Sequence, residues 1–127
     1  MDVVFLIGRI LLGGYFISAA INHLTKVTFM SQYAKAKGAP APAAAVVGTG
    51  ILLLLGGLSI LLGVYPFVGC ILLLIFLAGV SPVMHAYWKI QDPAARMGEM
   101  VNFMKNVALF GAVLIILTIP SPWPLKW

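Results

Sequence analysis

The sequence predicts an all-α membrane protein, with four transmembrane helices in an antiparallel up-and-down bundle that forms a single domain over residues 1–127. The chain is 62% hydrophobic and only 9% charged, with a mean hydropathy of +1.08. Soluble domains carry about 25% charged residues. Several apolar runs reach the length of about 20 residues that a spanning helix requires. Short connections between such helices favour antiparallel neighbours.

The first three spans follow from apolar length and from one proline. Residues 3–24 form the first run. It lacks the basic segment that begins a secretory signal, so we expect it to be retained as a span. The next apolar stretch is about twice the length of one span. Pro66 divides it, and because proline favours the first turn of a helix, we predict spans at 43–64 and 66–87 joined by a tight turn.

The fourth span is predicted at residues 103–119, where a proline-rich tail ends it. Before it, the stretch DPAARMGEM suggests a short interfacial helix with Asp92 as its cap and Pro93 as its first residue. Between the first two spans, the helix breakers of KAKGAPAPAAA favour an ordered lead into the second span rather than a continued helix.

The basic residues predict the orientation in the membrane. An even number of spans places both ends of the chain on one side. Six basic residues fall on the opposite side, which the positive-inside rule assigns to the cytoplasm, so both termini are predicted to lie outside. These six are Lys26, Lys35, Lys37, Lys89, Arg96 and Lys105.

Small and aromatic residues suggest how the spans pack and anchor. Glycine and serine allow close helix contact in lipid, so the ridge Gly14, Ser18 and Asn22 is a predicted packing face of the first span. Tyr87, Trp88, Trp123 and Trp127 fall at predicted span ends, where amphipathic rings prefer the headgroup layer.

Polar side chains from three spans are predicted to meet at one membrane edge. His23 and Asn22 end the first span, His85 lies near the end of the third, and Asn102 and Asn106 begin the fourth. They are candidate ligand-binding residues of a shallow pocket. The alternative is that they serve as hydrogen-bonding links between helices. Ligation of haem by the two histidines is a third interpretation, with no supporting signature.

Arg9 is a separate candidate, about two turns inside the first span. Its side chain either snorkels to phosphate or points inward as a fixed charge for an anionic headgroup, a quinone or a partner carboxylate. It lies about 21 Å along the helix from His23, too far to share one small ligand.

Other functional groups are scarce. The acids are Asp2, Asp92 and Glu99, and none is predicted deep in a span, which argues against proton-coupled transport. One cysteine allows no internal disulfide. The sequence contains no catalytic motif, no metal-ligand cluster and no basic stripe for nucleic acid. We therefore expect no catalytic or metal site in this chain alone.

The order of several motifs resembles the DoxX-like family of small four-span membrane proteins. They are Gly8-Arg9, YAKAKGAPAPAAA at 33–45, LLLLGGLSILLGVYP at 52–66, HAYW at 85–88 and FMKNVALFGAVL at 103–114. The characteristic residues are Arg9, Tyr33, Gly38, Pro40, Gly56, Gly57, His85, Lys105 and Asn106.

The resemblance implies an integral protein of a bacterial cytoplasmic membrane. Members are named from a subunit linked to thiosulfate:quinone oxidation, and some associate with membrane oxidoreductase assemblies. The leading interpretation is a non-catalytic subunit or scaffold of a redox or stress-related assembly, with other membrane or peripheral subunits as partners and a homo-oligomer allowed. If redox-linked, it would be a subunit of a quinone-dependent oxidoreductase. The alternatives are a quinone- or lipid-binding redox protein and a small facilitative transporter.

Overall fold

The computed structural model describes residues 1–126, and in these residues it has five α-helices and one 3₁₀ helix. Four of the helices are long and apolar enough to cross a membrane, which confirms the predicted four-span helical fold. The elements are α1 (Asp2–Thr25), α2 (Val27–Ala36), α3 (Pro42–Leu62), α4 (Pro66–Met84), η1 (Tyr87–Lys89) and α5 (Pro93–Leu117).

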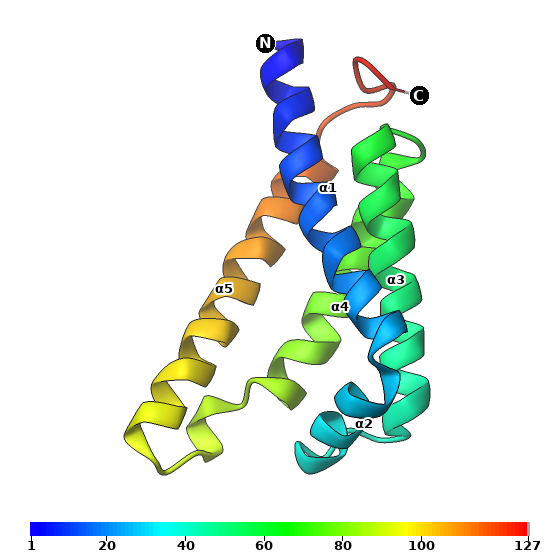
Figure 1. The fold of residues 1–127 in the computed structure, drawn as a ribbon. Helices are drawn as coiled ribbons and strands as arrows, with labels where there is room; N and C mark the ends of the chain where they lie inside the picture. Colours follow the sequence, from blue (N-terminus) through cyan, green and yellow to red (C-terminus); the bar gives the residue numbers. More distant parts are fainter. Residues whose placement is uncertain (127) are drawn as a thin grey trace.

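The spanning helices are arranged as an open bundle (Figure 1). α1 packs on α3, α3 on α4, and α4 on α5. The start of α1 and the C-terminal tail lie at the same end of the molecule (Figure 1). α1 and α5 approach each other near that end and diverge toward the other, where the short helix α2 lies (Figure 1). The structure therefore has a closed end beside the termini and an open end beside α2.

Two facing glycines bring α1 and α3 into close contact. A Cβ on Gly13 would lie 2.9 Å from the backbone oxygen of Gly57, and a Cβ on Gly57 would lie 3.0 Å from that of Gly13. The packing face of α1 is therefore not the predicted ridge. Gly14, Ser18 and Asn22 are all exposed. The ridge prediction chose the correct spacing but the adjacent face, because a step of one residue turns a helix by about 100°.

The turn between α3 and α4 is as short as predicted. α3 ends at Gly63, which adopts a left-handed backbone with φ +71°, and Pro66 begins α4. Tyr65, just before the proline, is also left-handed, with φ +47°. The Ser59 hydroxyl donates to the Val64 carbonyl at 2.7 Å. This bond ties the turn to the last turn of α3.

Two helix boundaries and one whole helix differ from the sequence-based expectations. α4 ends at Met84 rather than at residue 87, two residues after the internal Pro82, which removes a backbone donor from the helix. The short interfacial helix is instead the first part of α5. Asp92 caps it as expected, accepting from the Ala95 amide at 2.9 Å. No strong helix breaker follows before the predicted span, so the helix continues. α2 was not anticipated.

Arg9 and Trp123 form the core of the closed end. Arg9 is 2% exposed, and its guanidinium donates to the carbonyls of Ile60 at 3.1 Å and Leu61 at 3.0 Å, at the end of α3. It also donates to two tail carbonyls, those of Pro124 at 2.6 Å and Leu125 at 3.3 Å. Arg9 therefore points inward and ties the tail to α1 and α3.

Trp123 is 2% exposed, so its ring packs inside the protein and is not the exposed anchor that the sequence suggested. Its ring meets Phe5 edge-on at 5.2 Å between centroids and lies 5.7 Å from the Arg9 guanidinium. Trp88, in contrast, is 48% exposed, which suits an interfacial anchor. The predicted anchor Trp127 lies outside the described residues.

Candidate functional site: a cavity at the open end

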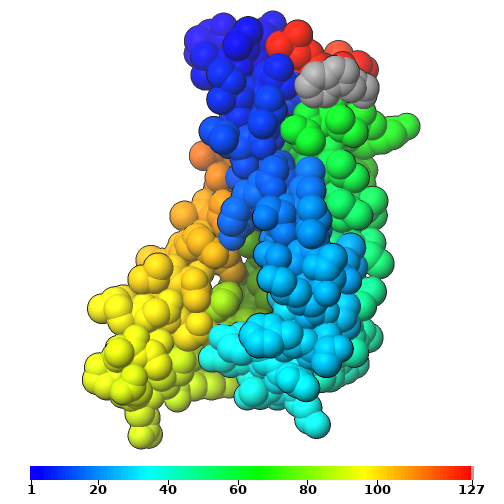
Figure 2. Space-filling model, viewed as in Figure 1, coloured from blue at the N-terminus to red at the C-terminus, as the bar shows by residue number. Residues whose placement is uncertain are grey.

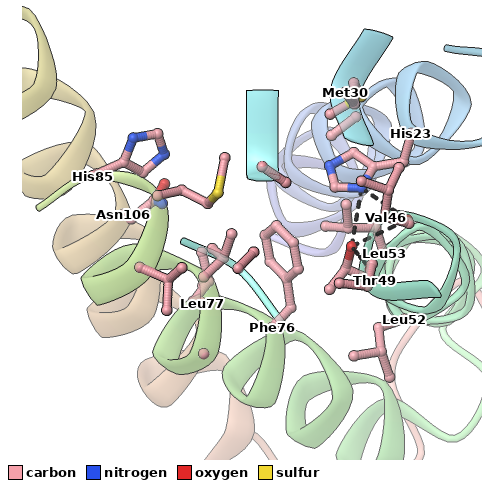
Figure 3. Close-up of a pocket in the computed structure, with 18 of the residues that line it drawn as sticks. His23, Met30, Val46, Thr49, Leu52, Leu53, Phe76, Leu77, His85 and Asn106 are labelled. Atoms are coloured by element: carbon pink, nitrogen blue, oxygen red, sulfur yellow. Dashed lines mark hydrogen bonds between the residues drawn. The ribbon is translucent and has the colours of Figure 1, made fainter. Parts of the chain in front are cut away.

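A cavity of about 490 Å³ occupies the open end, between α1 and α2 on one side and α4 and α5 on the other. Most of its wall is apolar, and Figure 3 shows Leu52, Leu53, Phe76 and Leu77 on it. Pockets for small molecules have this size and this apolar character, with a few polar groups that orient the ligand. The polar side chains on the wall are those of Tyr15, His23, Tyr33, Thr49, His85, Lys105 and Asn106.

His23 lines the cavity from α1 and is held by two groups of α3. Its Nδ1 lies 3.2 Å from the Val46 carbonyl oxygen and 3.1 Å from Thr49 Oγ1 (Figure 3). Its ring also meets Phe76 of α4 edge-on, at 5.9 Å between centroids. Contacts on both sides therefore fix the ring, and its other nitrogen faces the cavity (Figure 3).

His85 lines the opposite wall, where α4 ends. Its Nδ1 lies 3.2 Å from Glu99 Oε2 of α5. The same carboxylate contacts Lys37 Nζ at 3.3 Å and accepts from the Asn102 amide at 3.1 Å. Glu99 thus joins the end of α4, the segment after α2 and the start of α5 in one polar cluster.

Asn106 of α5 is the most enclosed polar group on the wall. It is only 6% exposed, and within residues 1–126 its side-chain amide has no hydrogen-bond partner. Figure 3 places it beside His85. The side chain is enclosed as a whole, but its amide atoms are not sealed off, and Asn106 lies on the cavity wall, so the amide is available to a bound molecule. Asn106 is therefore a candidate for a ligand contact.

The structure gathers three of the six predicted site residues around one cavity: His23, His85 and Asn106. Asn102 is not on the cavity wall. Its amide donates to Glu99, and Glu99 in turn contacts His85, which is on the wall. Asn22 is exposed and is not on the wall. Arg9 is at the closed end, bound to backbone carbonyls. In the part of the chain that the structure describes, no group of three or more His, Cys, Asp or Glu is placed to hold a metal ion.

Several polar residues on the cavity wall or beside it were missed by sequence reasoning. Glu99 was noted only as an acid outside the spans, and Lys37 only as a loop charge. Thr49 sits among apolar residues of α3, one of the few polar side chains in that span. A polar residue inside an otherwise apolar span was the signal that could have identified it. The contact between Lys37 and Glu99 depends on where α2 lies, which the sequence did not indicate.

The cavity opens between α1 and α5. Figure 2 shows the molecule hollowed between α5 on one side and α1 with α2 on the other, with α4 behind. Two side-chain contacts cross this opening. Lys105 Nζ of α5 lies 5.7 Å from the Tyr15 ring centroid of α1, and Lys37 contacts Glu99. Because α1 and α5 are spanning helices, the opening between them faces the lipid.

Comparison with known proteins identifies the family. A model of the DoxX family matches residues 4–86, which is more than half of the chain. The inner membrane protein YphA of Escherichia coli (strain K12) is 28% identical over 114 residues, covering 90% of this chain and 81% of that protein. No solved structure gives a significant match. Together with the four apolar helices, the family match shows that the chain is an integral membrane protein of the DoxX family.

Proposed function

We propose that this chain is a membrane protein that binds a lipid-soluble molecule with a small polar head and an apolar body. Quinones and single-headed lipids belong to this chemical class. The observation that carries the proposal is the cavity of about 490 Å³ at the open end, apolar over most of its wall and lined by His23, His85 and Asn106. Such a wall suits an apolar body with one hydrogen-bonding end.

The position of the opening supports the same class of ligand. A molecule dissolved in the bilayer reaches the cavity between α1 and α5 without crossing water. His23, His85 and Asn106 come from the end of α1, the end of α4 and the middle of α5, and the two histidines lie toward the end where α2 lies. A head held there leaves the apolar body beside Leu53 and Leu77, deeper in the bundle.

Titration of the detergent-solubilised protein with decylubiquinone tests the proposal, with one pair of glycine variants as a matched control. A Cβ on Gly79, on the cavity wall, would meet open space, and so would a Cβ on Gly14, on the outer face of α1. We expect Gly79→Phe to fill part of the cavity and lower the affinity at least tenfold, whereas Gly14→Phe keeps the wild-type affinity. Equal affinity in all three proteins would contradict the proposal, and so would failure of the wild type to bind either decylubiquinone or its reduced form, which carries two hydroxyl groups.

The subunit role, the redox link and the transport activity expected from the sequence stay predictions. Purification in mild detergent with a search for stoichiometric partners tests the first, and a liposome flux assay tests the last. The cavity is compatible with each role, since a subunit or a carrier also needs a place for its ligand.

A further inference from the structure

The hydrogen bonds behind His23 decide which of its nitrogens carries a proton. Nδ1 lies 3.2 Å from the Val46 carbonyl oxygen, and a carbonyl only accepts. The hydrogen of the Thr49 hydroxyl is directed to the Ala45 carbonyl at 2.6 Å, so that hydroxyl also receives from the histidine. Nδ1 therefore carries the proton. In the neutral ring, Nε2 is then a hydrogen-bond acceptor.

The environment of His85 leads to the same tautomer. Its Nδ1 lies 3.2 Å from Glu99 Oε2, and a carboxylate accepts. Lys37 Nζ lies 3.3 Å from that same oxygen and already supplies the balancing positive charge. In the neutral ring, Nε2 is then an acceptor as well.

Both acceptor nitrogens face the cavity. In Figure 3 the ring nitrogen of His23 that takes no part in the dashed bonds points toward the space between α1 and α4, and His85 turns a ring nitrogen toward the same space. Neither Nε2 has a hydrogen-bond partner among residues 1–126. Asn106, beside them, has both a donor and an acceptor to offer.

From this arrangement we infer that the cavity selects a ligand whose head carries a hydroxyl donor, rather than one with only carbonyl or ether oxygens. The inference rests on the proposed function and narrows its ligand class. A head that only accepts would leave the two imidazole nitrogens buried without a donor, which costs binding free energy. Two sources supply such a head: an aromatic hydroxyl, as in a reduced quinone, and an aliphatic hydroxyl, as in an alcohol lipid.

The test compares molecules that differ in one donor. We would titrate the detergent-solubilised wild-type protein with 4-dodecylphenol and with its methyl ether, and in parallel with 1-dodecanol and its methyl ether. We expect a hydroxyl compound to bind about tenfold more tightly than its ether, since a site built to hydrogen-bond a hydroxyl discriminates against the analogue that lacks it. A preference confined to the phenol pair assigns the aromatic source, and a preference in the dodecanol pair assigns the aliphatic one.

Variants assign the preference to the two rings. His23→Phe and His85→Phe keep a planar ring and remove the acceptor, so each is expected to reduce the preference for the hydroxyl at least threefold. Asn22 is next to His23 in the chain but is exposed and does not line the cavity, so Asn22→Ala should keep the preference for the hydroxyl. Equal affinity of each hydroxyl compound and its ether in the wild type overturns the inference while leaving the proposed function intact. An unchanged preference in both Phe variants also overturns it. Binding of none of the four compounds, nor of decylubiquinone, removes the proposed function itself.

Discussion

The two ends of this bundle use buried polar side chains in opposite ways. At the closed end, Arg9 is 2% exposed and donates to four backbone carbonyls at 2.6–3.3 Å. At the open end, Asn106 is 6% exposed, yet within residues 1–126 its amide has no partner. His23 and His85 each use one ring nitrogen for protein contacts and turn the other to a cavity.

This difference separates a structural role from a binding role. A group whose hydrogen bonds go to backbone carbonyls joins segments of the chain and has little left to offer a ligand. A group that is enclosed but keeps an unused donor or acceptor contributes little to the fold and is available to a partner. Burial of a polar residue in a membrane protein is therefore not enough to suggest a site. Whether its hydrogen bonds go to the protein or are left for a ligand decides between a structural role and a binding role.

Replacement of Arg9 is expected to have the largest effect. In Arg9→Met, the carbonyls of Ile60, Leu61, Pro124 and Leu125 lose a charged donor. We expect the free energy of unfolding to fall by about 3 kcal/mol or more, with ligand affinity of the folded protein unchanged. Denaturation in detergent micelles measures the change. Lys105→Met is the control at the open end, where the exposed ammonium lies over Tyr15, and it should leave stability nearly unchanged. Similar stability of both variants would contradict a structural role for Arg9.

A methyl group added between α1 and α3 is expected to have the second-largest effect. In Gly57→Ala the new Cβ would lie 3.0 Å from the Gly13 backbone oxygen and 2.9 Å from Ile17 Cγ1, so the helices must separate. Overpacking of this kind costs about 1–3 kcal/mol. Gly79→Ala, whose Cβ meets open space on the cavity wall, should be neutral or slightly stabilising. Thermal denaturation of the two proteins checks the pair, and a Gly57→Ala protein as stable as Gly79→Ala would refute the close contact.

Replacement of Asn106 should lower ligand affinity and keep stability, which is the reverse of the effect expected at Arg9. In Asn106→Leu an amide without a partner in the described chain becomes apolar, so stability should be kept or raised. The ligand loses a hydrogen bond, and we expect the affinity for 4-dodecylphenol to fall about tenfold, which equals about 1.4 kcal/mol. Titration and denaturation of the same preparation give both numbers. A large loss of stability with unchanged affinity would instead give Asn106 a structural role like that of Arg9.

The smallest effect is expected at Glu99. Glu99→Gln keeps the shape of the side chain but removes the charge that Lys37 and His85 contact. All three side chains are partly exposed, so the free energy of unfolding should change by less than about 1 kcal/mol. The affinity for 4-dodecylphenol should fall about threefold, because His85 is held less firmly. An affinity change as large as that of Asn106→Leu would mean that Glu99 touches the ligand itself.

Much of the fold followed from the sequence because it depends on local length and composition. Four apolar runs set the four spans, and Pro66 marked the turn between α3 and α4. Asp92 and Pro93 marked a helix start, although the helix they begin proved to be the span itself. Of the site, the cavity residues His23, His85 and Asn106 were selected as polar groups at one depth.

What the sequence did not predict depends on rotation and on distant contacts. Gly13 rather than Gly14 packs on α3, a choice set by the partner helix and not by spacing. Trp123 was expected to be an exposed anchor because it lies near a span end, but its ring packs inside the protein against Arg9 and Phe5. The Lys37–Glu99 contact joins positions 62 residues apart, brought together only when α2 is in place.

The gap between α1 and α5 has a consequence for how affinity should be expressed. Any molecule that enters by that route dissolves first among the acyl chains, and its occupancy then follows its mole fraction there. A dissociation constant quoted per volume of buffer would drift with the amount of detergent or phospholipid in the sample. Reported as moles of ligand per mole of amphiphile, the same measurements should coincide across preparations.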